Sequence, residues 1–60
     1  MHLILVPTYN EYQNITRLLD ALCAIPSVHV LVIDDASPDG TAEVVRAHAH
    51  FSHKVLLLVS

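Results

Sequence analysis

The chain has 60 residues, of which 53% are hydrophobic, and a formal net charge of −3. The high apolar content and low charge exclude a disordered chain, and the length allows at most one small domain. Its three cations, Arg17, Arg46 and Lys54, are scattered and form no basic patch for phosphates, which argues against nucleic acid as a partner.

Other protein classes are also excluded by the residue content. The single cysteine, Cys23, cannot form a disulfide within the chain. No apolar stretch approaches the roughly 18 residues needed to span a bilayer. The first residues lack the basic region and cleavage site of a signal peptide. Because the chain is short and has a high apolar content, we expect it to be one part of a larger hydrophobic core.

Residues 3–6 form the first predicted strand, which Pro7 ends because proline cannot donate to a sheet ladder. Asn10, with Gln13 three residues on, is close to a capping box and predicts a helix over residues 11–24, which Pro26 closes. The apolar positions of this helix form one stripe, at the spacing that faces a sheet. They are Ile15, Leu18, Leu19, Leu22 and Cys23.

Residues 28–33 form the second predicted strand. Its apolar run, residues 30–33, is β-branched and shows no alternation, which predicts burial on both faces. The strand stops at Asp34 and Asp35, and a turn-rich stretch follows. Asp39 is the expected cap of a second helix over residues 40–50, and residues 54–59 form the third strand. The inward face of the second helix is predicted to carry Ala42, Val45 and Ala49, with Val44 alongside.

This order of elements predicts an α/β fold. It is the β-α-β-α-β half of a doubly wound, Rossmann-like parallel sheet with right-handed crossovers and the strand order 3-2-1. The loops at residues 7–11 and 34–40 then emerge side by side at the carboxyl edge of the sheet, where open α/β sheets bind ligands.

The side chains of the two loops suit a nucleoside. Tyr9 can stack on a base, and Asp35 can accept hydrogen bonds from the ring N–H groups of uracil or guanine. Glu11 can bind a ribose hydroxyl or the base edge. Three structural alternatives stay open. The Tyr9 ring packs over the helix start, Glu11 only complements the helix dipole, or the two aspartates only end a strand and cap a helix.

Several rival motifs fail. The first loop has no glycine, which excludes a G-x-G-x-x-G dinucleotide site and a P-loop. Residues 35–40 imitate the start of an EF-hand, but Arg46 stands at the twelfth position instead of Glu. His48, His50 and His53 do not share a helix face at this spacing, so a metal there is not favoured. Asn14 begins a glycosylation sequon, but it lies inside the predicted helix.

Two motifs carry a family resemblance. The sequence PTYNE at residues 7–11, followed by IDDASPDGT at residues 33–41, resembles the start of inverting glycosyltransferases of the GT-A fold, family 2. The subgroup it most resembles is the dolichol- or polyprenol-phosphate mannosyltransferases. The resemblance covers nearly the whole chain, residues 1–60, but only the first, nucleotide-binding part of the family's domain.

The resemblance implies roles for particular residues. Asp34 would be mainly structural and Asp39 a helix cap. At position 36 the family usually has Gly, and Ala36 costs on the order of 1 kcal/mol if the position needs φ > 0. The residues implied to contact the nucleoside are Pro7, Tyr9, Glu11, Ile33 and Asp35.

The resemblance also implies a reaction, which is transfer of a hexose to a polyprenyl or dolichyl phosphate at the cytosolic face of a membrane. The expected donor is GDP-mannose or a UDP-hexose, and the hexose is expected to be mannose. A divalent cation, Mg or Mn, is expected in the full-length enzyme, with ligands from a later D-x-D motif that this chain lacks. The alternative is a stand-alone nucleotide-binding or interaction module without catalysis. Alone, the 60 residues are expected to be inactive and to self-associate through unpaired apolar sheet surfaces.

Overall fold

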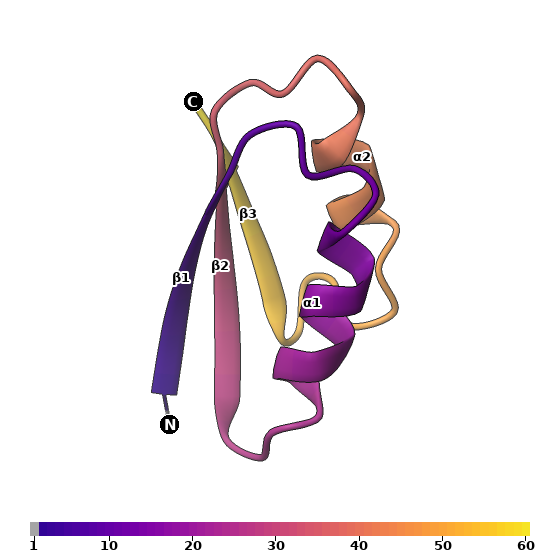
Figure 1. Ribbon diagram of the computed structural model, residues 1–60. Coiled ribbons are helices and arrows are strands. Elements are labelled where there is room, and N and C mark those ends of the chain that lie inside the picture. The colour runs from indigo at the N-terminus through magenta and orange to yellow at the C-terminus, as the bar shows by residue number, and fades with distance from the viewer. Residues whose placement is uncertain (1) are drawn as a thin grey trace.

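The computed structural model describes residues 2–60; the predicted domain also includes Met1, which lies outside the described residues. In chain order the elements are β1 (His2–Thr8), α1 (Ile15–Cys23), β2 (Val28–Asp34), α2 (Thr41–Arg46) and β3 (Val55–Val59). The strands form one parallel sheet, and both helices lie on the same side of it (Figure 1). The predicted α/β class and parallel sheet are confirmed.

The strands lie in the order β1-β2-β3, so β2 is paired on both sides. These are the same neighbours as in the predicted order 3-2-1, counted from the other edge. Thr8 at the end of β1 is in register with Asp34 at the end of β2, and Asp34 with Val59 of β3. The carboxyl ends of the strands therefore meet at one edge of the sheet, and the loops that follow β1 and β2 leave from there (Figure 1).

The core lies between the helices and one face of the sheet. Strand side chains alternate between faces, so every second residue of β2 points to the helices. Val30 and Val32 have no exposed surface there. The buried apolar cluster is completed from all the other elements except β1, and its members are Ile15, Leu19, Cys23, Val28, Val30, Val32, Val45 and Val55.

The other face of the sheet is covered by no helix of the described chain. Leu3 and Leu5 of β1 are each 57% exposed, and Leu56 and Leu58 of β3 are 51% and 54% exposed. We call these four residues the open sheet face. In β2 the residues on this side, His29, Leu31 and Ile33, are only half-buried, so the predicted burial of the second strand on both faces is wrong within these residues. The reason is that both crossovers pass on the same side of the sheet (Figure 1).

Pro7 does not end the first strand, as the sequence predicted, because β1 continues through it to Thr8. The Thr8 carbonyl accepts the Asp35 N–H at 3.0 Å, so the backbone of Thr8 is directed towards β2. In a parallel pair the preceding residue is directed the other way, to the free edge. Pro7 therefore costs the ladder no hydrogen bond.

α1 begins later than predicted, and the capping box does not form. Its N-cap position is held by Asn14 rather than Asn10, and no side chain caps it. Before it, the N–H groups of Asn14 and Ile15 donate to the Glu11 carbonyl at 3.0 and 2.9 Å, which makes a turn. Asn10 has a left-handed backbone with φ of 55°, and a turn rather than a helix follows it.

The apolar stripe of α1 is largely as predicted. Ile15, Leu19 and Cys23 are buried, and Leu22 is partly buried against the same cluster. Leu18 is 43% exposed, which corrects its placement in the stripe. No helix within residues 2–60 is both long and apolar enough to cross a bilayer.

α2 ends earlier than the predicted helix over residues 40–50. Ala42 and Val45 are buried as predicted, but Ala49 lies beyond the helix and is exposed. The helical bonding pattern is already left at His48, whose N–H donates to the Val45 carbonyl at 3.1 Å, and the His50 N–H then donates to Nδ1 of the His48 ring at 3.2 Å. A continuing helix would need that N–H for the carbonyl of Arg46.

Candidate functional site

Two loops meet at the carboxyl edge of the sheet. The first loop is residues 9–14, between β1 and α1, and the second loop is residues 35–40, between β2 and α2. They lie next to each other in Figure 1, as the strand order predicts. The site is therefore built from these loops and the last residues of β1 and β2.

Asp34 is the hydrogen-bonding centre of this edge. Its side chain has no exposed surface and accepts hydrogen bonds from the Thr8 hydroxyl at 2.7 Å, the Ser37 hydroxyl at 2.6 Å and the Ser37 N–H at 2.9 Å. Burial raises the pKa of Asp34, but the bonds from Ser37 and Thr8 together outweigh it and hold the pKa below its ordinary value. Asp34 thus joins β1 to the second loop, which is the structural role expected of it.

Asp39 binds both the start of α2 and the first loop. Oδ1 accepts the Thr41 N–H at 3.0 Å and the Thr41 hydroxyl, and Oδ2 accepts the Tyr12 N–H at 3.1 Å. The Thr41 hydroxyl is the main reason that the pKa of Asp39 lies below its ordinary value. The loss of hydration opposes this effect, and the backbone N–H groups of Tyr12, Thr41 and Asp39 add to it. Asp39 therefore binds the first N–H of α2, but from one residue before the N-cap position, which Gly40 holds, so the predicted cap is wrong by one position.

Two positions of the second loop have a left-handed backbone. Gly40 has φ of 91°, a conformation that favours glycine. Ala36 has φ of 49°, at the position where the resembled family usually has Gly. Position 36 therefore does have φ > 0, the conformation in which alanine costs free energy relative to glycine.

Three of the predicted nucleoside contacts lie together at the end of β1 and β2. Pro7 and Ile33 are register partners, so they are neighbours on one face of the sheet. Val32 and Asp34 are buried on the helix side, Ile33 alternates to the open side, and Asp35 directly follows the strand. Pro7 and Asp35 are exposed and Ile33 is half-buried. These residues form an accessible surface with one carboxylate at its rim.

The other two predicted contacts, Glu11 and Tyr9, belong to the first loop. Glu11 lines a hollow next to this surface, and Tyr9 does not. Glu11 is half-buried and precedes α1, so it does not complement the first turn of that helix. Tyr9 is 56% exposed, which argues against a ring packed over the helix start. A hollow of about 220 Å³ between β1 and α1 includes Glu11 and Pro7; its other lining residues are Val6, Thr8, Asn14, Ile15 and Leu18.

A larger hollow of about 300 Å³ lies over the first loop, but it contains none of the predicted contacts. It is lined by Asn10, Tyr12, Gln13, Asn14 and Asp39. The main-chain N–H groups of Asn10 and Tyr12, and the carboxylate of Asp39, are already engaged in hydrogen bonds between the loops. We therefore place the candidate site at the exposed end of β1 and β2.

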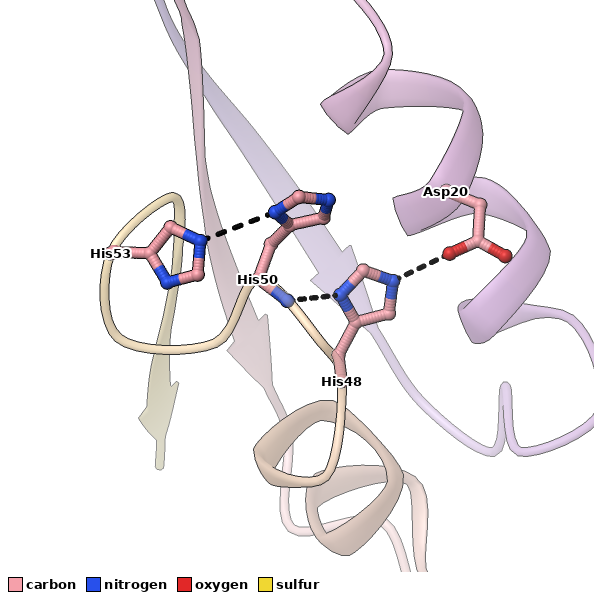
Figure 2. A network of polar contacts seen from close by, with 4 residues as sticks. All are labelled: Asp20, His48, His50 and His53. Atoms are coloured by element: carbon pink, nitrogen blue, oxygen red, sulfur yellow. Dashed lines mark hydrogen bonds and ion pairs between the residues drawn. The ribbon is translucent and has the colours of Figure 1, made fainter.

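The histidines after α2 form a polar network with α1 rather than a chelate of three ligands (Figure 2). The side chain of His48 is only 3% exposed; Nε2 bonds to Asp20 Oδ1 at 2.7 Å and Nδ1 accepts the His50 N–H. The rings of His50 and His53 meet at 3.2 Å between Nδ1 and Nε2. This network joins α1 to the segment before β3.

The described residues do not fit a metal. Within residues 2–60 no three His, Cys, Asp or Glu side chains converge on a point where an ion could bind. In the site itself, the oxygens of Asp34 and Asp39 are occupied by hydroxyl and N–H donors.

Cations lie away from the candidate site. Lys54 Nζ donates to the carbonyls of Cys23 and Ile25, at 2.8 and 3.0 Å, at the far end of α1. Arg46 pairs with Glu43 at 3.7 Å on the surface of α2. The loops themselves carry carboxylates and no Lys or Arg. The described site therefore suits the neutral, donor-bearing part of a nucleotide better than its phosphates.

Comparison with known proteins decides the family. The sequence pattern of Glycosyl transferase family 2 matches residues 3–60, which include both loops and all three strands except His2. The chain belongs to glycosyl transferase family 2. The resemblance drawn from the two motifs is thereby confirmed, and the matched residues include the exposed carboxyl edge.

Similar proteins of known name point to the same family. The chain is 50% identical over 40 residues to a polyprenol monophosphomannose synthase of Mycolicibacterium smegmatis, over 65% of this chain and 15% of that protein. It is 50% identical over 42 residues to an undecaprenyl-phosphate mannosyltransferase of Micrococcus luteus, over 68% and 17%. It is 38% identical over 47 residues to glycosyltransferase AglE of Haloferax volcanii, over 72% and 16%. The match thus spans about a sixth of these relatives. No solved structure matches the chain.

Sequence reasoning missed three residues that build the site. Thr8, Ser37 and Thr41 bind Asp34, Asp39 or the first loop through their hydroxyl groups. The available signal was the alternation of acids and hydroxyl residues through the turn-rich stretch after β2. Such short polar side chains commonly bind neighbouring backbone groups.

Proposed function

We propose that this chain is the nucleoside-binding part of an enzyme that transfers a hexose from a nucleotide sugar to a polyprenyl phosphate. The hexose is mannose and the donor is GDP-mannose, with a UDP-hexose as the other candidate donor. In the reaction, the bond between the anomeric carbon and the nucleoside diphosphate breaks, and a bond to the acceptor phosphate oxygen forms. The nucleoside diphosphate leaves, and the anomeric centre is inverted.

One structural observation carries the proposal. Pro7 and Ile33 lie side by side at the carboxyl edge, with Asp35 exposed beyond them and Glu11 in the adjacent hollow. An apolar platform can contact a flat base or the ribose, and the carboxylates accept hydrogen bonds from base N–H or ribose hydroxyl groups. Tyr9, exposed at the start of the first loop, is proposed to contact the same nucleoside.

The relatives supply the proposed sugar and acceptor. Two proteins with 50% identity are named as a polyprenol monophosphomannose synthase and an undecaprenyl-phosphate mannosyltransferase. A polyprenyl phosphate is held in a membrane, so we propose that the whole protein acts at its cytosolic face. We further propose that GT-A strands beyond these 60 residues complete a doubly wound sheet.

A divalent cation, Mg or Mn, belongs to the same proposal. It would neutralise the donor diphosphate, which the carboxylate-rich loops of this chain repel. Its ligands would lie outside this chain, since the described acids do not converge on an ion.

The test is a transfer assay on the protein at its natural length. GDP-mannose and UDP-glucose are offered as labelled donors, with undecaprenyl phosphate as acceptor, and the lipid-linked sugar is measured. We expect transfer from GDP-mannose, abolished when the acceptor is omitted, and no transfer by the 60 residues alone. Binding of GDP or UDP without transfer to any polyprenyl phosphate would contradict the enzyme and support a binding module.

A further inference from the structure

Three consecutive N–H groups of the first loop bind side chains that follow β2. The Asn10 N–H donates to Ser37 Oγ at 2.9 Å, and the Glu11 N–H donates to Thr41 Oγ1 at 3.1 Å. The Tyr12 N–H donates to Asp39 Oδ2 at 3.1 Å. Each of these bonds therefore joins a backbone donor of the first loop to a side-chain acceptor about 27 to 30 residues further along the chain.

Each of the acceptors is itself held in place. The Ser37 hydroxyl donates to buried Asp34 at 2.6 Å. Thr41 has no exposed surface, and its hydroxyl donates to Asp39. Asp39 also accepts the Thr41 N–H at the first turn of α2. The acceptors are thus fixed to the end of β2 and the start of α2, which are parts of the packed structure.

These bonds hold the first loop against a competing local structure. The sequence around Asn10 and Gln13 favours a helix from residue 11, yet residues 11–14 form a turn and α1 starts at Ile15. An earlier helix start would direct the N–H groups of this segment elsewhere and would turn the side chains of residues 9–11. The contacts to Ser37, Thr41 and Asp39 select the observed loop.

We propose that Ser37, Asp39 and Thr41 are positioning residues for nucleoside binding. They hold the backbone that carries Tyr9 and Glu11 before the ligand arrives, and they do not contact the ligand themselves. A site fixed in advance loses less conformational entropy on binding, and therefore binds more tightly. This inference rests on the proposed function, because it assigns a nucleoside to Tyr9 and Glu11.

The matched variants are Thr41→Val and Thr41→Ser in the protein at its natural length. Valine has nearly the shape of threonine but cannot accept the Glu11 N–H, whereas serine keeps the hydroxyl. Two quantities are measured: hydrogen exchange of single amides, and the affinity for GDP and UDP by calorimetry. The amides of Val30 and Val32 in the buried strand β2 report on global stability.

With Thr41→Val, we expect exchange at the Glu11 amide to quicken at least about tenfold, and exchange at Val30 and Val32 to change less than about twofold. Nucleotide affinity should fall roughly 5- to 20-fold, as expected for a loop that must order on binding. Thr41→Ser should restore both quantities. Ser37→Ala should affect the Asn10 amide in the same way.

Several results overturn the inference. Unchanged exchange at Glu11 in Thr41→Val means that the bond holds nothing, and a parallel rise at Val30 and Val32 means that Thr41 acts only on global stability. The inference is also overturned if Thr41→Ser does not restore the exchange rate and the nucleotide affinity. Unchanged nucleotide affinity in Thr41→Val overturns the positioning role but leaves the proposed function standing. Absence of nucleotide binding in the unmodified protein overturns both.

Discussion

Asp34 and Asp35 are adjacent in the chain, but Asp34 is the last residue of β2 and Asp35 is the first residue after it. Asp34 is fully buried under three hydrogen bonds, and Asp35 is exposed, with the Ser60 hydroxyl 3.4 Å from its carboxylate. The first acid can therefore maintain the loop while the second remains open to a ligand. The roles of the two carboxylates are therefore tested by different experiments.

Asp34 should make the stability of the chain depend on acid pH. Its pKa is lowered in the folded state, so the unfolded chain binds the proton more readily. The contribution is complete above the unfolded value of about 4 and is lost as the pH falls through the folded pKa. Asp34→Asn should lower the melting temperature at pH 7, and this difference should shrink below about pH 4.

Circular dichroism melts between pH 2.5 and pH 7 measure this effect. The exposed neighbour offers a matched control, because Asp35→Asn removes the same charge without removing a buried hydrogen-bonding centre. If Asp34→Asn and the unmodified chain differ by the same amount at every pH, the ionised Asp34 carboxylate does not stabilise the loop.

Replacing Ala36 with glycine should stabilise the folded chain. Its φ of 49° is unfavourable for a residue with a Cβ, and glycine removes that strain. We expect Ala36→Gly to raise the free energy of unfolding by about 0.5–1 kcal/mol in urea titrations. Ala21→Gly, at an exposed position inside α1, should instead lower it by about 1 kcal/mol. A loss of stability from both substitutions would show that position 36 is not strained.

At the scale of the elements, the parallel sheet followed from the sequence and the helix boundaries did not. The apolar runs and the β-α-β order constrain topology strongly, since crossovers are right-handed and strands without alternation suit a parallel sheet. The start of α1 depends on Ser37, Asp39 and Thr41, which lie far along the chain and cannot be read from local capping residues. Beyond the end of α2, the His50 N–H bonds to the ring of His48 instead of a helix carbonyl, a contact that local propensity does not predict.

The candidate site was predictable in position but not in its construction. Pro7, Ile33 and Asp35 meet where the strand order places them. The hydroxyl groups of Thr8, Ser37 and Thr41 form bonds whose partners only the fold brings together.

The end of α1 should depend on Lys54. Its ammonium donates to two carbonyls there, those of Cys23 and Ile25, at 2.8 and 3.0 Å, where the helix dipole favours a cation. We expect Lys54→Met to lower the free energy of unfolding by about 1–2 kcal/mol in urea. Arg46→Met is the control, since its exposed ion pair with Glu43 should contribute less than about 0.5 kcal/mol. Equal effects of the two substitutions would contradict a capping role for Lys54.

At the scale of the whole molecule, the uncovered side of the sheet decides how the 60 residues behave alone. The four leucines of the open sheet face are each more than half exposed, and the outer edge of β1 has no strand partner among residues 2–60. Exposed apolar patches and free strand edges promote association. In the whole protein we propose that further chain covers these surfaces.

The isolated 60 residues should therefore self-associate in a concentration-dependent manner. Sedimentation velocity over a hundredfold concentration range measures it. Leu5→Lys with Leu58→Lys should reduce association, because both charges lie on the open sheet face and outside the core. Leu18→Lys, on the helix side, is the control and should leave association unchanged. A monomer with a cooperative melt at every concentration would refute this expectation.

The central claim is that the exposed end of β1 and β2 binds the nucleoside of a nucleotide sugar, and calorimetry of GDP and UDP binding to Asp35→Asn tests it most directly. The protein is used at its natural length, with Glu43→Gln as a control that removes an exposed acid from α2. Loss of a charged acceptor should weaken binding of the preferred nucleotide by about 1.5–3 kcal/mol, or roughly 10- to 150-fold, and the control should bind like the unmodified protein. Unchanged affinity in Asp35→Asn, or equal losses in the two variants, would contradict this location for the nucleoside.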